Sequence, residues 1–183
     1  MKQILHVLTL VILISAFFAS CKEDRLEVMH DNEVSAREKY IKDNNLEQYR
    51  DSSGIYIRIN QPQSSDSSIV KGYKVMLQYN IFLLDSTKVL TTENSAGQTM
   101  QEDAFFVDVS NEIVNQNYVQ KIAGMHIGLK KMRIGDRAFM VIPSELAYKA
   151  VDLSGTIGIP RFSTLVVYVY AKKGYSPYQQ QNQ

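Results

Sequence analysis

Residues 132–149 read MRIGDRAFMVIPSELAYK and contain the signals that decide the fold. The apolar run 137–142 predicts a strand, and Pro143 ends it because proline cannot donate to a strand ladder. The chain then enters a Gly- and Pro-containing stretch that predicts a loop over 143–162. Tyr148 is a polar aromatic residue in this loop, and a loop of that length inside a compact domain usually has a functional role.

The segments on either side of this stretch have the period of strands, with one exception. Alternating apolar residues predict strands over 55–59, 73–84, 105–109 and 164–171. Residues 118–130 change to the helical period, because Tyr118, Ile122, Met125 and Leu129 form one stripe. Strands that surround a single central helix indicate an α+β domain.

The N-terminal 20 residues predict an export signal. Lys2 precedes an apolar run that is too short for a transmembrane span and typical of a secretory signal. The run ends in small residues before Cys21, the only cysteine, which indicates a lipobox whose cysteine is lipidated after residues 1–20 are removed. Cleavage by ordinary signal peptidase near Cys21 is the alternative. We expect an outer-membrane lipoprotein, on either the periplasmic or the cell-surface side.

Residues 21–51 predict a tether followed by a short helix. The charged stretch from Cys21 to about Met29 would lift the domain off the membrane. Asn32 is a candidate N-cap for a surface helix that ends near Asp43, and Asn44-Asn45 would supply a left-handed stop.

Charge and residue counts exclude several classes of site. The whole chain has 20 basic and 19 acidic residues, and removing residues 1–20 takes away Lys2 and no acid, so the mature charge is zero. No basic patch indicates a nucleic-acid partner. Lipidation of Cys21 leaves no thiol, and loss of His6 leaves only His30 and His126, so we expect no metal site and no cofactor. His126 lies off the apolar stripe, and we expect it in solvent.

Four stretches resemble the FKBP-type prolyl isomerases: GLKKMRIGDRAFMVIPSELAYK, IPRFSTLVVYVY, GYKVMLQYNIFLLDSTKVL and SSGIYIRI. The resemblance covers about residues 52–172. It implies an FKBP-like antiparallel sheet of five to six strands wrapped around one short helix over 52–173, and residues 174–183 would be a disordered tail. Together with the lipobox, the chain is similar to the FKBP-type lipoproteins associated with gliding motility.

The resemblance implies a peptidyl-prolyl cis-trans isomerase that acts on X–Pro bonds of exported proteins. An amide resists rotation by roughly 18–20 kcal/mol because its C–N bond is partly double. A dry apolar pocket favours the less polar twisted state, so the chemistry requires no nucleophile, metal or cofactor.

Carrying the family's roles onto this sequence implies an apolar cleft. Its members would be Tyr79, Val89, Leu90, Phe105, Ile122, Met125, Tyr148, Ile159 and Val167. The backbone N–H of Ile122 would bind a ligand carbonyl, and Phe105 could exchange its place with Phe106. The hydroxyl of Tyr148 would point into the cleft, so we expect Tyr148 to contact ligand rather than to stabilise the fold.

Leu90 is the main departure from the family. It aligns with an aspartate that orders the pocket, and leucine cannot accept a hydrogen bond. This substitution predicts weak turnover. Two alternatives to an enzyme therefore stay open: a non-catalytic binding or chaperone module, and a structural lipoprotein that packs against gliding machinery. The default interpretation of the apolar set is plain core.

Overall fold

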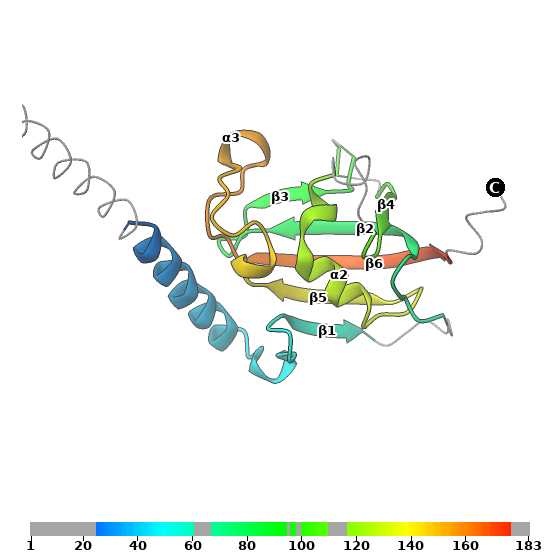
Figure 1. Cartoon of the computed structure of the whole chain (residues 1–183), viewed down its shortest axis with the longest axis horizontal. Coiled ribbons are helices and arrows are strands. Elements are labelled where there is room, and N and C mark those ends of the chain that lie inside the picture. The colour runs from blue at the N-terminus through cyan, green and yellow to red at the C-terminus, as the bar shows by residue number, and fades with distance from the viewer. Residues whose placement is uncertain (1–24, 61–66, 95, 98–99, 110–116, 177–183) are drawn as a thin grey trace, which may run out of the picture.

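The computed structural model describes residues 25–60, 67–94, 96–97, 100–109 and 117–176 (Figure 1). Its six strands are β1 (Tyr56–Asn60), β2 (Lys74–Phe82), β3 (Lys88–Thr91), β4 (Asp103–Phe106), β5 (Arg137–Ile142) and β6 (Leu165–Tyr175). They form one antiparallel sheet in the order β1-β5-β6-β2-β3, with β4 also paired to β2. The predicted α+β class, with a five- to six-stranded antiparallel sheet, is confirmed.

Strand β2 defines the two faces of the sheet. Its residues alternate strictly, with Val75, Leu77, Tyr79 and Ile81 buried on what we call the inner face. β6 pairs along one edge of β2, while β4 and then β3 pair along successive parts of the other edge. β3 has no counterpart among the predicted strands, and β4 starts two residues before the strand predicted over 105–109.

The central helix crosses the inner face and is interrupted (Figure 1). A 3-10 turn, η3 (Val119–Lys121), is followed by Ile122 in an extended conformation and then by α2 (Ala123–Leu129). The continuous helix predicted over 118–130 is therefore wrong at Ile122. The stripe itself is confirmed, because Ile122, Met125 and Leu129 are fully buried.

The N-terminal helix covers residues 25–43 and begins earlier than predicted. The described residues 25–29, expected in the tether, are its first turns, and it runs beside the end of the sheet where β5 stops and β6 starts (Figure 1). It ends before Asn45, whose φ of 53° provides the predicted left-handed stop. Ile41 and Leu46 then pack on the outer face of the sheet.

Short helical turns divide the predicted loop 143–162. They are the 3-10 turn η4 (Ser144–Leu146) and the one-turn α-helix α3 (Ser154–Ile157). Another 3-10 turn, η1 (Glu47–Tyr49), precedes β1. β6 continues to Tyr175, beyond the predicted strand end at 171 and domain end at 173. Cys21, the signal segment and residues 177–183 of the tail lie outside the described residues. Within the described part of the chain, no helix has the length and apolar character needed to cross a membrane.

Candidate functional site

The nine residues implied by the family resemblance lie in one apolar cluster on the inner face. Seven of them are buried: Tyr79, Phe105, Ile122, Met125, Tyr148, Ile159 and Val167. Val89 and Leu90 are half-buried at its margin. Phe105 is only 3% exposed, whereas Phe106 faces outward under the ammonium group of Lys74, so Phe105 occupies the inward register. The same burial also fits plain core, so grouping alone does not assign a function.

A carboxylate accepts the hydroxyl of Tyr79 within this cluster. Tyr79 donates to Oδ2 of Asp103 at 2.9 Å, and the side-chain amide of Asn117 donates to the same oxygen at 2.9 Å. The Asn117 oxygen in turn accepts from the backbone N–H of Val119 at 2.9 Å. Asp103 therefore connects the pocket tyrosine to the start of η3.

Strand register places Asp103 and position 90 equally close to Tyr79, and of the two residues only Asp103 can accept its hydrogen bond. On the inner face Leu90 lies opposite Ile81, and Asp103 lies opposite Leu77. Each is thus a diagonal neighbour of Tyr79, one on β3 and the other on β4. Cross-strand diagonal neighbours are within reach of long and aromatic side chains. Asp103 could not be predicted from the sequence, because its pairing with β2 is set by the fold and leaves no local signal.

Tyr148 has a partner inside the protein. Its side chain is 8% exposed, and its hydroxyl donates to the backbone carbonyl of Tyr118 at 2.8 Å. This bond argues against the expectation that Tyr148 does not stabilise the fold, because one such hydrogen bond contributes about 0.5–1.5 kcal/mol to the folded state. Contact between Tyr148 and a ligand stays a prediction.

Both tyrosines remain neutral donors. Burial raises the pKa of Tyr79 well above its usual range, and the negative charge and hydrogen bond of Asp103 raise it further. Burial also raises the pKa of Tyr148, with a smaller contribution from Tyr118. Neither hydroxyl ionises near neutral pH, so each can only donate its proton or accept a further bond as a neutral phenol.

The backbone N–H of Ile122 is also occupied. It donates to the carbonyl of Val119 at 3.1 Å, closing the 3-10 turn. The expected free donor for a ligand carbonyl is therefore not available in this conformation. A ligand would have to compete with the turn for this N–H, as it would compete with Tyr118 for the hydroxyl of Tyr148.

Gln120 and His126 attach β4 to the central helix, and neither was predicted to do so. The Gln120 side chain bonds both the N–H of Phe106 at 2.9 Å and its carbonyl at 2.5 Å. His126 accepts from the N–H of Asp108 at 3.0 Å and contacts the carbonyl of Gln120 at 2.8 Å, while its ring packs 4.7 Å from that of Phe105. The expectation of a solvated His126 is wrong, because polar backbone next to α2 gives both ring nitrogens a partner.

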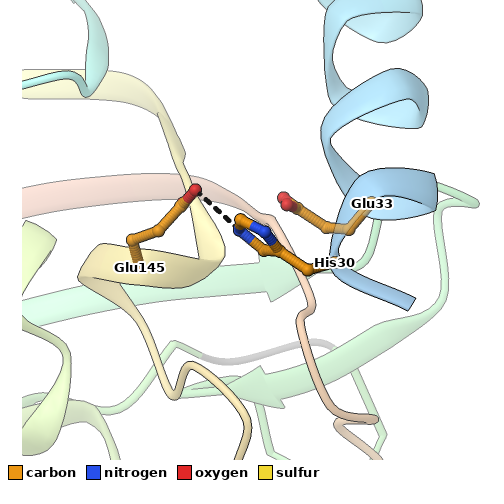
Figure 2. Close-up of side chains that lie close together, drawn as sticks. All are labelled: His30, Glu33 and Glu145. Carbon is orange, nitrogen blue, oxygen red and sulfur yellow. Dashed lines mark hydrogen bonds and ion pairs between the residues drawn. The ribbon is translucent and has the colours of Figure 1, made fainter. Parts of the chain in front are cut away.

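The N-terminal helix is fastened to the loop that carries Tyr148 and Ile159. His30 and Glu33 on the helix point toward Glu145 of η4 (Figure 2). His30 lies 3.1 Å from Glu145 and its ring packs against Phe162, while Thr164 donates to the buried Glu33. Both ends of the loop between β5 and β6 are therefore held from outside.

Arg37 organises these carboxylates. Its Nη1 donates to Glu33 at 3.0 Å and to Glu145 at 2.9 Å. His30, Glu33 and Glu145 also place potential metal-ligand atoms within 4.8 Å of one another. A metal ion would have to displace a guanidinium that already pairs with both carboxylates, so the group is best described as an ion-pair network.

Comparison with known proteins agrees with this geometry. The profile of the family described as FKBP-type peptidyl-prolyl cis-trans isomerase matches residues 65–170, more than half of the chain. No curated protein sequence matches.

Solved structures share the fold at low sequence identity. FkpA from Escherichia coli is 24% identical with a TM-score of 0.64, over 90% of this chain and 70% of that one. A peptidyl-prolyl cis-trans isomerase from Pseudomonas syringae pv. tomato is 19% identical with a TM-score of 0.59, over 80% of this chain and 96% of that one. The three FKBP domains of wheat FKBP73 give 19% identity and a TM-score of 0.54, over 69% of this chain and 48% of that one. The fold, the grouped apolar residues and the family match together lead to one conclusion: the chain belongs to the FKBP-type peptidyl-prolyl cis-trans isomerase family.

Proposed function

We propose that this chain isomerises X–Pro bonds of exported proteins at the inner-face cluster, with modest turnover, and so assists the folding of envelope or gliding-machinery proteins. Membership of the family supports the reaction class. The observation that carries the proposal is the bond from Tyr79 to Asp103, because it keeps a carboxylate at the pocket although Leu90 cannot provide one.

The site would act by excluding water and holding a twisted amide. The apolar side chains favour the less polar twisted state, in which the carbonyl has lost part of its charge. Tyr148 would exchange its bond to Tyr118 for one to the substrate, which holds the carbonyl during rotation. Tyr79, held by Asp103, would form a fixed wall.

A binding module without useful turnover is the second candidate. It is favoured by the internal bonds of Tyr148 and Ile122, which a substrate must replace, and by Leu90. On this alternative the site would grip proline-containing or apolar segments.

A chromogenic proline-peptide isomerisation assay separates the two candidates. The detergent-solubilised full chain would be compared with its Tyr148→Phe variant and with Tyr170→Phe, which changes a tyrosine on the outer face. Turnover that falls in Tyr148→Phe and is kept in Tyr170→Phe supports the enzyme. Peptide binding without turnover in the parent chain would support the binding module instead.

We also propose that lipid on Cys21 anchors the protein to the outer membrane. The sequence before Cys21 supports this, and a triacylated cysteine inserts more than one chain, as stable anchoring requires. Cys21→Ala should release the protein from the membrane fraction or block its processing. Protease added to intact cells then distinguishes the sides, because digestion indicates the cell surface and protection until lysis indicates the periplasm.

A further inference from the structure

The outer face of the sheet carries a hollow of about 250 Å³, separate from the inner-face cluster. Strand pairing arranges its lining into two rows, each crossing β1, β5, β6 and β2. The first row is Asn60, Arg137, Tyr170 and Gln78, and the second is Arg58, Phe139, Tyr168 and Asn80. Both rows therefore lie on one face and combine arginine, aromatic and amide side chains.

Aromatic rings hold the two guanidinium groups in place. The Arg137 guanidinium carbon lies 3.9 Å from the centroid of Tyr170, and that of Arg58 lies 5.5 Å from Phe139 and 5.6 Å from Tyr49. A stacked guanidinium keeps its N–H edge available for a carboxylate, which it binds through two parallel hydrogen bonds.

The hollow is positively charged. Among the described residues, no carboxylate lines it and neither Arg58 nor Arg137 forms an ion pair. On the far side, Gln78 is fixed to the carbonyl of Met100 at 3.1 Å and Asn80 to Glu93 at 2.7 Å. The Tyr168 side chain is 50% exposed and offers an apolar surface between the arginines and the amides.

We infer that this hollow binds an extended acidic polypeptide segment with carboxylates two residues apart. Arg58 and Arg137 are diagonal neighbours on adjacent strands, a relationship that separates side chains by about 7–8 Å. Acidic residues at i and i+2 of an extended chain point the same way and are about 6.6–6.8 Å apart. The spacing of the carboxylates thus matches the spacing of the two strand positions that carry the arginines.

The width of the hollow agrees with a short peptide. Four strands span three interstrand spacings, about 14 Å in total. An extended segment of about four residues covers this distance. The concave shape fits a single chain better than the flat surface of a bilayer, so we assign the hollow to a peptide.

Fluorescence anisotropy with short labelled peptides tests this assignment without reference to isomerase activity. The probe is Thr-Glu-Thr-Glu-Thr, and its controls are the isomer with adjacent glutamates and the Gln-for-Glu peptide. The detergent-solubilised full chain would be compared, at low ionic strength, with Arg58→Gln and Arg137→Gln. Arg25→Gln removes the same charge from the exposed start of the N-terminal helix and serves as the matched control.

We expect Arg58→Gln and Arg137→Gln each to weaken binding of the probe by about tenfold, the scale of one lost bidentate pair. Arg25→Gln should bind like the parent chain, and the adjacent-glutamate isomer should bind more weakly than the probe. Amide resonances of Tyr168 and Tyr170 should shift on titration. The assignment is overturned by absence of binding, by equal losses in all three variants, or by stronger binding of uronate oligomers or anionic vesicles than of the probe.

Discussion

The hydroxyl of Tyr79 donates to Asp103 Oδ2 across two paired strands, and the oxygen that accepts it also accepts the amide of Asn117. One carboxylate thus fixes the pocket tyrosine on β2 and the entry to η3. The central helix that follows is placed relative to the sheet by a polar contact inside an apolar cluster, where leaving either donor unpaired is costly.

We predict that Tyr79 and Asp103 are energetically coupled. Asp103→Leu leaves the buried hydroxyl without an acceptor and should lower the free energy of unfolding by about 1–3 kcal/mol. Adding Tyr79→Phe removes the orphaned group, so the double variant should be less destabilised than the sum of the two single variants. Urea denaturation of the four proteins measures this, and additivity within about 0.5 kcal/mol would show that the bond contributes nothing.

Restoring an aspartate at position 90 should not by itself raise turnover. Tyr79 has one proton to donate, and Asp103 already accepts it. Leu90→Asp would place a second carboxylate diagonal to Tyr79 without a donor, which is unfavourable for a partly buried group. The double variant Leu90→Asp, Asp103→Leu removes the present acceptor and frees Tyr79 to turn toward position 90. We expect proline-peptide turnover to fall in the single variant and to recover in the double variant; a gain in the single variant would contradict the arrangement of these three residues.

Tyr148→Phe should affect both stability and function. Loss of the bond to the Tyr118 carbonyl should lower the free energy of unfolding by about 0.5–1.5 kcal/mol, the net contribution of one hydrogen bond. Affinity for proline peptides should fall as well. Denaturant titration and peptide binding measure the two effects separately, and unchanged binding at reduced stability would assign Tyr148 a purely structural role.

The elements that could be predicted are those whose signal is apolar and local. β2 and β5 were found because alternation and Pro143 mark them, while β3 escaped because its four residues are half-exposed and partly polar. The helix stripe was found, but its break is a backbone property of Ile122 that spacing does not reveal. Three polar residues were not predicted, because each acquires its role from a distant segment: Asp103, Gln120 and Glu33. The spacing of apolar residues gives no information on which polar residues become buried.

Arg37 should position the loop that carries Tyr148. Arg37→Met leaves Glu33 buried without its cation, and breaking a buried pair in this way costs up to about 3–5 kcal/mol. Lys39→Met removes an exposed pair with Asp43 on the same helix and should cost little. Hydrogen exchange of the backbone over 144–163 should accelerate in the first variant alone; equal exchange in the two variants would remove Arg37 from this role.

The same network should make helix docking sensitive to acid. Burial opposes ionisation of Glu145, but hydrogen bonds from its own backbone, Arg37 and His30 outweigh burial and hold its pKa below the usual range. The pKa of Glu145 in the folded protein lies below the unfolded value of about 4.3. The ionised Glu145 therefore contributes to the free energy of unfolding at neutral pH, and this contribution is lost as the pH falls through the folded pKa. Urea titrations between neutral and acidic pH should therefore show a steeper acid loss in the parent chain than in Glu145→Gln.

Because α2 and β5 are in close contact, we predict that replacing Gly124 of the central helix by alanine destabilises the protein, although alanine has a higher helix propensity than glycine. A Cβ on Gly124 would lie 2.4 Å from Cγ2 of Ile142, a fully buried and branched side chain that cannot turn away. Gly124→Ala should lower the free energy of unfolding by about 1–3 kcal/mol through overpacking. It should also weaken proline-peptide binding, because α2 would move outward and carry Met125 with it. Gly155→Ala is the control, since a Cβ there meets no atom within 4 Å, and it should be neutral or slightly stabilising. If Gly124→Ala unfolds at the same urea concentration as Gly155→Ala, the helix is not held against β5 as tightly as the contact with Ile142 requires.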